Sequence, residues 1–371
     1  MQKEEIKKFV AILGVFLLFY LLPGQSEWFN VSVVEGLELL NDYAKEHVLT
    51  CLVPALFIAG AIGVFIKKDS VLKYLGADAN RYLSYGIASV SGAILAVCSC
   101  TILPLFAGIR KRGAGLGPAI TFLFSGPAIN VAAIFLTMSV LGFEIGIARI
   151  VFSIILAILI GISMSLIFRE KTEKGKLLIQ DNETPKISST ITILFFIMMV
   201  GILVVNGMQI DFIIKYLIMG ALVLGIVLIS VFKFEKETRN EWIKETWDFS
   251  KKILPLLFAG VFIAGFVMPL LPEQLITEIV GQNTIFANLV ASIFGAFMYF
   301  STLTEIPILQ ALIAKGMHMG PALALLLAGP SLSLPNMLVI RGLMGTKKTA
   351  IYILLVVFYS TIAGLLFGHM F

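Results

Sequence analysis

Charged residues are scarce in this sequence. Asp, Glu, Lys and Arg make up 14% of its 371 residues, whereas hydrophobic residues make up 58%. A soluble domain carries roughly a quarter charged residues, so an ordinary soluble fold is excluded. Unbroken apolar runs, such as 145–168 and 217–232, recur along the chain. Lipid cannot satisfy an open backbone, and the runs lack the alternation of membrane β-barrels. The sequence therefore predicts an all-α polytopic membrane protein.

Other absences narrow the function. The three cysteines, Cys51, Cys98 and Cys100, all lie in apolar stretches, which is not the pattern of a secreted disulfide framework. No glycine-rich phosphate loop is present, so the sequence predicts no ATP site. The three histidines are scattered without metal-ligand spacing. The net charge of +5 comes from short basic clusters beside apolar runs, so we expect no nucleic-acid partner and no cofactor.

Nine segments are predicted to cross the membrane fully: 6–22, 49–66, 117–141, 145–168, 188–207, 211–232, 253–271, 319–340 and 349–368. The stretch 235–250, which precedes the predicted span 253–271, is amphipathic. It is predicted to lie in the cytoplasmic interface of the membrane.

Two further apolar stretches, 83–109 and 284–314, are interrupted by polar residues and proline. If both are re-entrant hairpins and the N-terminus is cytoplasmic, 24 of the 28 Lys and Arg residues lie inside. The outside then keeps Lys45, Arg149, Lys215 and Lys315. If both stretches cross, only 12 lie inside and 16 outside. The positive-inside rule favours the hairpin arrangement for both stretches. The charge distribution alone is less decisive for the second stretch, 284–314, than for the first.

An internal repeat supports the second hairpin. Pro54 matches Pro255 at an offset of 201, and three further sites match at 203. These are Pro104, Gly117-Pro118 and Gly126-Pro127 with Pro307, Gly320-Pro321 and Gly329-Pro330. Chance similarity between apolar helices is the alternative. The repeat divides the chain into 1–168, a cytoplasmic linker and connector helix at 169–207, and 208–371. An odd number of crossings separates equivalent positions, so the halves are predicted to be inverted repeats, as in secondary transporters.

The pair Cys98 and Cys100 lies at the predicted tip of the first hairpin, followed by Thr101. In extended chain, residues two apart point to the same side, and two thiolates form a soft site for a thiophilic ion. The alternative is that both are inert apolar fillers, as buried free cysteine commonly is. Cys51 lacks this context and is predicted to be core.

The second hairpin carries Glu305, near Thr302. A carboxylate in hydrocarbon is costly, so it usually faces a cavity or a partner, and we expect Glu305 to bind a cation or carry a coupling proton, unless the tip is simply wet. Asn130 and Asn336 follow the two Gly-Pro pairs, either lining the path or joining helices by hydrogen bonds. The predicted hinges are Pro104, Gly126, Pro127, Pro307, Gly329 and Pro330.

Proline disrupts helix at the residue four positions earlier. The two hairpin helices are therefore predicted to break at Cys100 and Leu303. The break would leave the backbone extended at residues 98–100, and it would let Cys98 or Cys100 face Thr302 or Glu305 near the bilayer centre.

These motifs resemble a known family. Residues 98–118 read CSCTILPLFAGIRKRGAGLGP, residues 121–130 read TFLFSGPAIN, residues 299–307 read YFSTLTEIP and residues 328–336 read AGPSLSLPN. They look like the signature of the ArsP-like predicted permeases, and the resemblance covers almost the whole chain. It implies an inner-membrane permease, in a family that includes an exporter of trivalent organoarsenicals. A related copper and zinc efflux branch typically carries an acidic residue where 125–130 reads SGPAIN, which argues against divalent-metal transport.

Two functions follow as hypotheses. The first is a multi-pass plasma-membrane transporter, not an enzyme, that exports a small thiophilic solute such as an organoarsenical or soft metal(loid). The alternative is a membrane thiol oxidoreductase that uses Cys98 and Cys100 as an exchange pair. No quinone or flavin site is visible in the sequence, so transport is favoured.

The predicted topology is testable by cysteine-accessibility labelling at 110–112 and at 169–187. With a cytoplasmic N-terminus and nine spans, both segments should be labelled only from the cytoplasmic side, and the C-terminus should lie outside. External labelling at 110–112 would mean that 83–109 crosses the membrane completely.

Overall fold

The computed structural model describes residues 26–65, 74–76, 79–95, 99–169, 189–207, 211–267, 279–298 and 305–370, with the single positions 13, 20 and 269. Every secondary-structure element assigned in these ranges is a helix. The all-α prediction is therefore confirmed for the described part of the chain. The predicted first span at 6–22 lies almost entirely outside it.

In the first half of the sequence the helices are α2 (Glu27–Tyr43), the π-helical segment η1 (Ala44–Leu52), α3 (Val53–Phe65), α5 (Arg81–Leu95), α6 (Ser99–Lys111), α7 (Leu116–Ala128), α8 (Val131–Val140) and α9 (Phe143–Ile167). The connector is α10 (Ser189–Gly207). The second half contains α11 (Phe212–Lys233), α12 (Lys236–Val267), α14 (Ile285–Phe297), α15 (Glu305–Ala314), α16 (Met319–Ala328), α17 (Leu334–Met344) and α18 (Thr346–Met370).

Among the described residues, four helices are long and apolar enough to cross a membrane: α9, α11, α12 and α18. The number becomes five if α7 and α8 together form one bent span. Several apolar helices survive from the sequence prediction with nearly unchanged bounds, including those at 145–168, 188–207, 211–232 and 349–368. The total of nine crossings stays a prediction.

Two predicted spans are broken rather than continuous. The segment 117–141 forms α7 and α8, which are bent by 46° at their junction. The segment 319–340 forms α16 and α17, separated by residues 329–333. Both breaks follow a Gly-Pro pair, and proline removes a helical backbone donor and clashes with the preceding turn. The Gly-Pro pairs, which were predicted as hinges, therefore lie at interrupted helices, although the predicted spans 117–141 and 319–340 were drawn as continuous.

Two other boundaries also differ from the sequence prediction. The amphipathic stretch 235–250 is not a separate interfacial helix, because it continues through Pro255 into the 32-residue helix α12. Helix α2 was not predicted at all, since its acidic residues lower its hydropathy. It packs along α12, where an added Cβ on Gly265 would lie 2.8 Å from the Cα of Gly36.

Each predicted hairpin contains two helices, α5 with α6 and α14 with α15. The prediction of extended backbone at Cys100 is wrong, because α6 begins at Ser99 and is helical at Cys100. Pro104 lies inside α6, so the bond it forfeits is the one to the Cys100 carbonyl, and the helix continues past it to Lys111. Cys98 and Leu303 lie outside the described residues.

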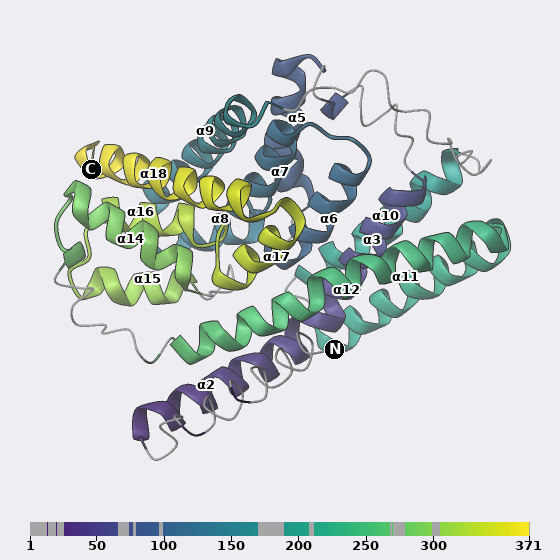
Figure 1. Ribbon diagram of the computed structural model, residues 1–371, viewed down its shortest axis with the longest axis horizontal. Helices are drawn as coiled ribbons and strands as arrows, with labels where there is room; N and C mark the ends of the chain where they lie inside the picture. The colour runs from purple at the N-terminus through teal and green to yellow at the C-terminus, as the bar shows by residue number, and fades with distance from the viewer. Residues whose placement is uncertain are drawn as a thin grey trace.

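The two halves pack in a similar way (Figure 1). Helix α7 packs against both α5 and α9, and α16 packs against both α14 and α18. Across the halves, α9 contacts α18, α8 contacts α15, and α6 contacts α17. The long helices α11 and α12 run along the side of the molecule away from α9 and α18. Helix α10 packs against α11, and α3 packs against α12.

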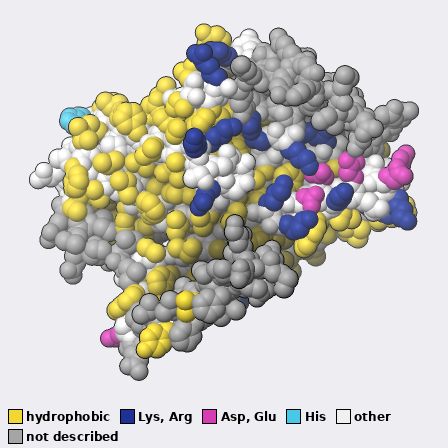
Figure 2. All heavy atoms as spheres, in the orientation of Figure 1, with side chains coloured by type: hydrophobic (Ala, Val, Ile, Leu, Met, Phe, Trp, Pro, Cys, Tyr) yellow, Lys and Arg dark blue, Asp and Glu magenta, His cyan; other side chains and the backbone are white. Residues whose placement is uncertain are grey.

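Apolar side chains cover much of the surface (Figure 2). On α11, the exposed fractions of Ile213, Leu217 and Phe232 are 74%, 70% and 75%. Lys and Arg gather in a band across the face shown. An apolar surface bordered by basic residues is what a lipid environment requires.

Close helix packing predicts a stability effect at Gly364. A Cβ added there would lie 2.6 Å from the Gly320 carbonyl oxygen, a backbone atom that cannot turn aside. Gly364→Ala should therefore destabilise the detergent-solubilised protein by about 1–3 kcal/mol, the usual cost of overpacking. The matched control is Gly220→Ala, where no described atom lies within 4 Å of the added Cβ. Thermal unfolding monitored by size-exclusion chromatography measures both, and equal midpoints would show that α16 and α18 are not in close contact.

Candidate functional site

The centre of the site is Arg149, on the second turn of α9, whose side chain has no exposed surface. Its Nη2 donates to Oε1 of Glu305 at 2.7 Å, and its Nη1 donates to Oγ1 of Thr137 at 3.0 Å. Its Nε donates to the Ala128 carbonyl oxygen at 3.3 Å. The guanidinium therefore joins the end of α7, the middle of α8 and the start of α15.

Glu305 is the first residue of α15 and its side chain is 1% exposed. Oε1 accepts the bond from Arg149, whereas Oε2 has no hydrogen-bond partner among the described residues. A Cβ added to Gly329, at the end of α16, would lie 3.6 Å from Oε2. The second carboxylate oxygen therefore lies beside the break between α16 and α17.

Helix ends explain this placement of charge. Ala128 is the last residue of α7, so its carbonyl has no partner within the helix. The negative end of α7 favours the Arg149 cation, and the positive start of α15 favours the Glu305 anion. A charge-assisted bond in a dry interior is strong, but each partner depends on the other, because an unpaired buried charge costs several kcal/mol.

The structure corrects the assignment of Arg149. The charge distribution predicts that it lies outside with Lys45, Lys215 and Lys315, as one of the charges that set orientation. It is instead buried inside a helix that is apolar enough to span the membrane. The available signal was a single cation within the run 145–168, since an ionisable residue in a membrane helix usually has a buried partner.

The predicted site residues are only partly described. Thr101 is buried in α6. Asn130 is structural at least in part, because its Oδ1 accepts from the Ala133 backbone amide at 3.4 Å at the start of α8. Asn336 is buried in α17, and its Oδ1 has no partner among the described residues.

The side chains of Cys51, Cys98, Cys100 and Thr302 lie outside the part of the structure that is described. The meeting of thiol and carboxylate at the hairpin tips therefore stays a prediction. Within the described ranges, no group of three His, Cys, Asp or Glu residues could hold a metal ion. The described contact of Glu305 is instead with Arg149.

The helix breaks of the two halves touch. Ser331, between α16 and α17, donates from its Oγ to the Phe124 carbonyl on α7 at 3.4 Å. The Tyr352 hydroxyl on α18 donates to the Ser331 carbonyl at 3.4 Å. Tyr352 follows Arg149 by 203 positions and Ser331 follows Ala128 by the same number, so equivalent side chains bond equivalent carbonyls in the two halves.

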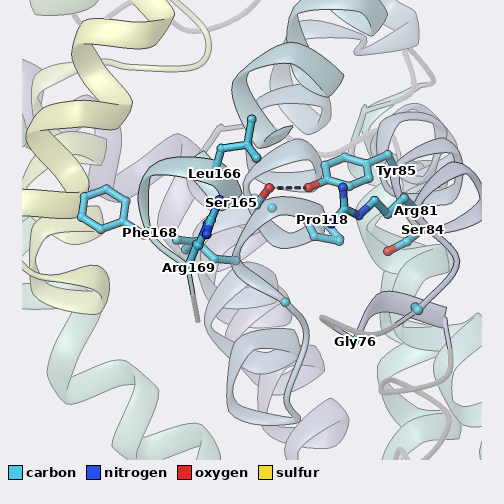
Figure 3. Close-up of a pocket in the computed structure, with 13 residues that line it drawn as sticks. Gly76, Arg81, Ser84, Tyr85, Pro118, Ser165, Leu166, Phe168 and Arg169 are labelled. Atoms are coloured by element: carbon cyan, nitrogen blue, oxygen red, sulfur yellow. Dashed lines mark hydrogen bonds between the residues drawn. The ribbon is translucent and has the colours of Figure 1, made fainter. Parts of the chain in front are cut away.

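A polar pocket of about 420 Å³ lies at the other end of α7 (Figure 3). Its lining includes Arg81, Ser84, Pro118 and Arg169, and the Tyr85 hydroxyl donates to the Ser165 Oγ at 3.1 Å. Pro118 and Ala128 are ten residues apart, which is about 15 Å along a helix. Helix α7 therefore connects this pocket to the buried ion pair.

Interrupted helices, a buried cross-half ion pair and an apolar exterior define a polytopic membrane protein with a polar centre. Comparison with known proteins agrees. Residues 34–369 match the model of the predicted-permease family ArsP_1. The chain belongs to this family, and the resemblance drawn from its motifs is confirmed.

Relatives support this assignment. A UPF0718 protein of Methanocaldococcus jannaschii is 45% identical over 345 residues, covering 88% of this chain and 93% of the relative. The UPF0718 protein YraQ of Escherichia coli is 22% identical over 304 residues, covering 81% and 72%. A putative two-component membrane permease complex subunit of Streptococcus mutans is 29% identical over 141 residues, covering 38% and 46%. No solved structure is significantly similar to the chain.

The ion pair predicts strong coupling between its two residues. Arg149→Met or Glu305→Gln alone leaves a buried group without its partner, and Arg149→Met should cost about 3–5 kcal/mol because it strands the carboxylate. Combining the two substitutions should recover much of this loss. The control cycle uses the exposed Lys251–Asp248 pair at 2.8 Å, where coupling of about 0–0.5 kcal/mol is expected. Unfolding midpoints of the four variants in each cycle measure the coupling, and additive effects at Arg149 and Glu305 would show that they do not interact.

Proposed function

We propose that this permease is a secondary transporter that exports a small thiophilic solute, such as a trivalent organoarsenical or another soft metalloid compound. The observation that carries the proposal is the buried Arg149–Glu305 pair, which joins two broken helical segments from different halves of the chain. Ionisable residues at membrane depth mark substrate or ion pathways by default. Broken helices are where secondary transporters form their binding sites.

An inverted repeat is part of this proposal. Three kinds of contact recur at an offset of 203. Gly161 approaches the Gly117 carbonyl as Gly364 approaches that of Gly320, and Gly126 lies beside Ile102 as Gly329 lies beside Glu305. The third is the pair of carbonyl contacts made by Arg149 and Tyr352. Repeated contacts support two copies of one fold, and the charge distribution supports their inversion.

In the proposed repeat the ionic site is asymmetric. The positions equivalent to Arg149 and Glu305 are Tyr352 and Ile102, which cannot form an ion pair. The two copies of the contact between halves therefore differ: one is ionic and one is not. A proton or cation that reaches Glu305 would weaken only the ionic contact, so its arrival would bias the equilibrium between two arrangements of the halves.

In this mechanism Glu305 is the coupling group and Arg149 is its resident counter-ion. When Glu305 is free of its coupling ion, the pair holds α15 against α8 and α9. When a proton or cation neutralises Glu305, Arg149 retains its bonds to Thr137 and the Ala128 carbonyl, and the halves separate more easily. Export then follows if the solute binds Cys98 and Cys100 in one arrangement and leaves in the other.

The oxidoreductase alternative is not favoured. Membership in a permease family points to transport rather than enzymatic catalysis. The helical backbone at Ser99 and Cys100 also removes the extended conformation that was expected to turn the thiols to one side, which counts against a two-thiolate arrangement in either function. The side chains of Cys98 and Cys100 lie outside the described part of the structure, and in the proposed mechanism they are the candidate ligands for the solute.

Flux measurements in proteoliposomes test the proposal. Uptake of a trivalent methylarsenical into inside-out vesicles, driven by a pH gradient, should be abolished by Cys98→Ser combined with Cys100→Ser, since the soft ligands are lost. Cys51→Ser is the matched control and should keep wild-type flux. Glu305→Gln should remove the dependence on the pH gradient, because a neutral amide cannot exchange the proton.

The cysteine variants test the thiol site, and the Glu305 variant tests the coupling group. Full flux in the Cys98 and Cys100 double variant would rule out the thiol site, while leaving the coupling group intact. Unchanged pH dependence in Glu305→Gln, with the protein folded and inserted, would rule out Glu305 as the coupling group. Absence of arsenical flux in the wild-type protein, with flux of another solute, would reject the proposed substrate class.

A further inference from the structure

A second polar cavity lies between the two halves, away from the ion pair. It has a volume of about 380 Å³ and is formed by the end of α6, the middle of α12 and the junction of α17 with α18. Four basic side chains line it: Arg110, Lys111, Lys252 and Lys348. None of the described residues that line it is Asp or Glu. The cavity therefore concentrates positive charge from both halves of the chain.

Two described carboxylates of α12 lie outside this lining and pair with basic residues. Glu245 forms an ion pair with Lys111, and Asp248 pairs at 2.8 Å with Lys251, which is itself outside the lining. Two of the basic groups also contact neutral partners. Arg110 donates to the Ala114 carbonyl at 2.6 Å, and the Lys348 ammonium lies 6.0 Å from the centre of the Phe168 ring. The described lining therefore contains four basic side chains, one of which pairs with a carboxylate, and no acidic side chain.

The placement of Lys348 adds to this positive charge. It lies in the first turn of α18, which begins at Thr346 and has no acidic residue in that described turn. A cation at a helix start opposes the helix dipole, whereas an anion there is stabilised. The positive end of α18 and the four basic side chains therefore favour the same kind of ligand, one that carries negative charge.

Apolar side chains border the charged groups. Phe106 from α6, Phe249 from α12, and Leu343 with Met344 from α17 line the same cavity. A freely soluble anion gains nothing from such neighbours. A phospholipid gains from both parts, because its phosphate meets the cations and its acyl chains meet the apolar side chains. Basic pockets between membrane helices bind anionic headgroups in this way.

We propose that this cavity binds a phosphate-bearing anion, the headgroup of an anionic phospholipid such as phosphatidylglycerol. Because α6 belongs to the first half and α12, α17 and α18 belong to the second, the bound headgroup bridges the halves. The lipid thereby stabilises the observed arrangement of the halves. The site shares no residue with the proposed solute site or with the coupling group.

Native mass spectrometry of the intact protein in neutral detergent tests the site. The wild-type protein should retain phosphatidylglycerol and release phosphatidylcholine with the same acyl chains. Lys252→Gln combined with Lys348→Gln should weaken phosphatidylglycerol binding by about twenty-fivefold, since each basic residue near an anionic lipid surface contributes about fivefold in affinity. The matched control is Lys251→Gln with Lys347→Gln, which removes the same charge from adjacent positions that do not line the cavity. The control should bind phosphatidylglycerol within about twofold of wild type.

The outcomes are decisive. Equal loss of lipid in both double variants would show that only net charge matters and would overturn the site. Competition by inorganic phosphate as strong as that by phosphatidylglycerol would assign the cavity to a free anion and overturn the lipid. Retention of phosphatidylcholine equal to that of phosphatidylglycerol would show that the cavity does not recognise the anionic headgroup. Because binding is the readout, a failure of this test is separate from any failure of arsenical transport.

Discussion

The interaction on which the structure depends is the buried ion pair between Arg149 and Glu305. Neither charge is tolerable alone in hydrocarbon, where even insertion scales assign a few kcal/mol to a charged residue at a helix centre. Because the two residues are 156 positions apart, their pairing fixes the contact between halves. The guanidinium also bonds Thr137 and the end of α7. The pair therefore joins the end of α7 and the first described turn of α15 to α9.

Interrupted helices support this ion pair. An ion pair at membrane depth needs helix ends to support it, because a continuous helix offers no free carbonyl to a cation and no free amide to an anion. The Gly-Pro pairs supply such ends in both halves. In the proposed repeat, Tyr352 and Ile102 occupy the positions equivalent to Arg149 and Glu305, so only one of the two contacts is ionic. The basic cavity beside Lys252 and Lys348 bridges the halves at a separate place, so the proposed coupling ion and lipid act on one interface from two sites.

Much of the fold could be predicted from the sequence, and the centre of the site could not. Long apolar runs and the repeated prolines indicated the helical class and the position of most helices, because hydropathy and proline act locally. Glu305 stood out for its own cost in lipid. Its partner did not, because Arg149 is far away in sequence and was counted among charges that orient the protein. The helical backbone at Cys100 was missed because Pro104 removes one backbone hydrogen bond without ending α6. Helix α2 was missed because its stability comes from packing on α12 rather than from its own hydropathy.

The most direct test of this account is the distance between α9 and α15 when the ion pair is removed. Spin labels introduced as unnatural amino acids at the exposed positions Glu144 and Gln310 leave the native cysteines in place, and pulsed electron paramagnetic resonance gives the distribution of distances between them. The wild-type protein should show one narrow distribution, and Glu305→Gln should add a second population because the halves are no longer held together. Superimposable distributions in the two proteins would contradict the central claim that this ion pair holds the halves in the observed arrangement.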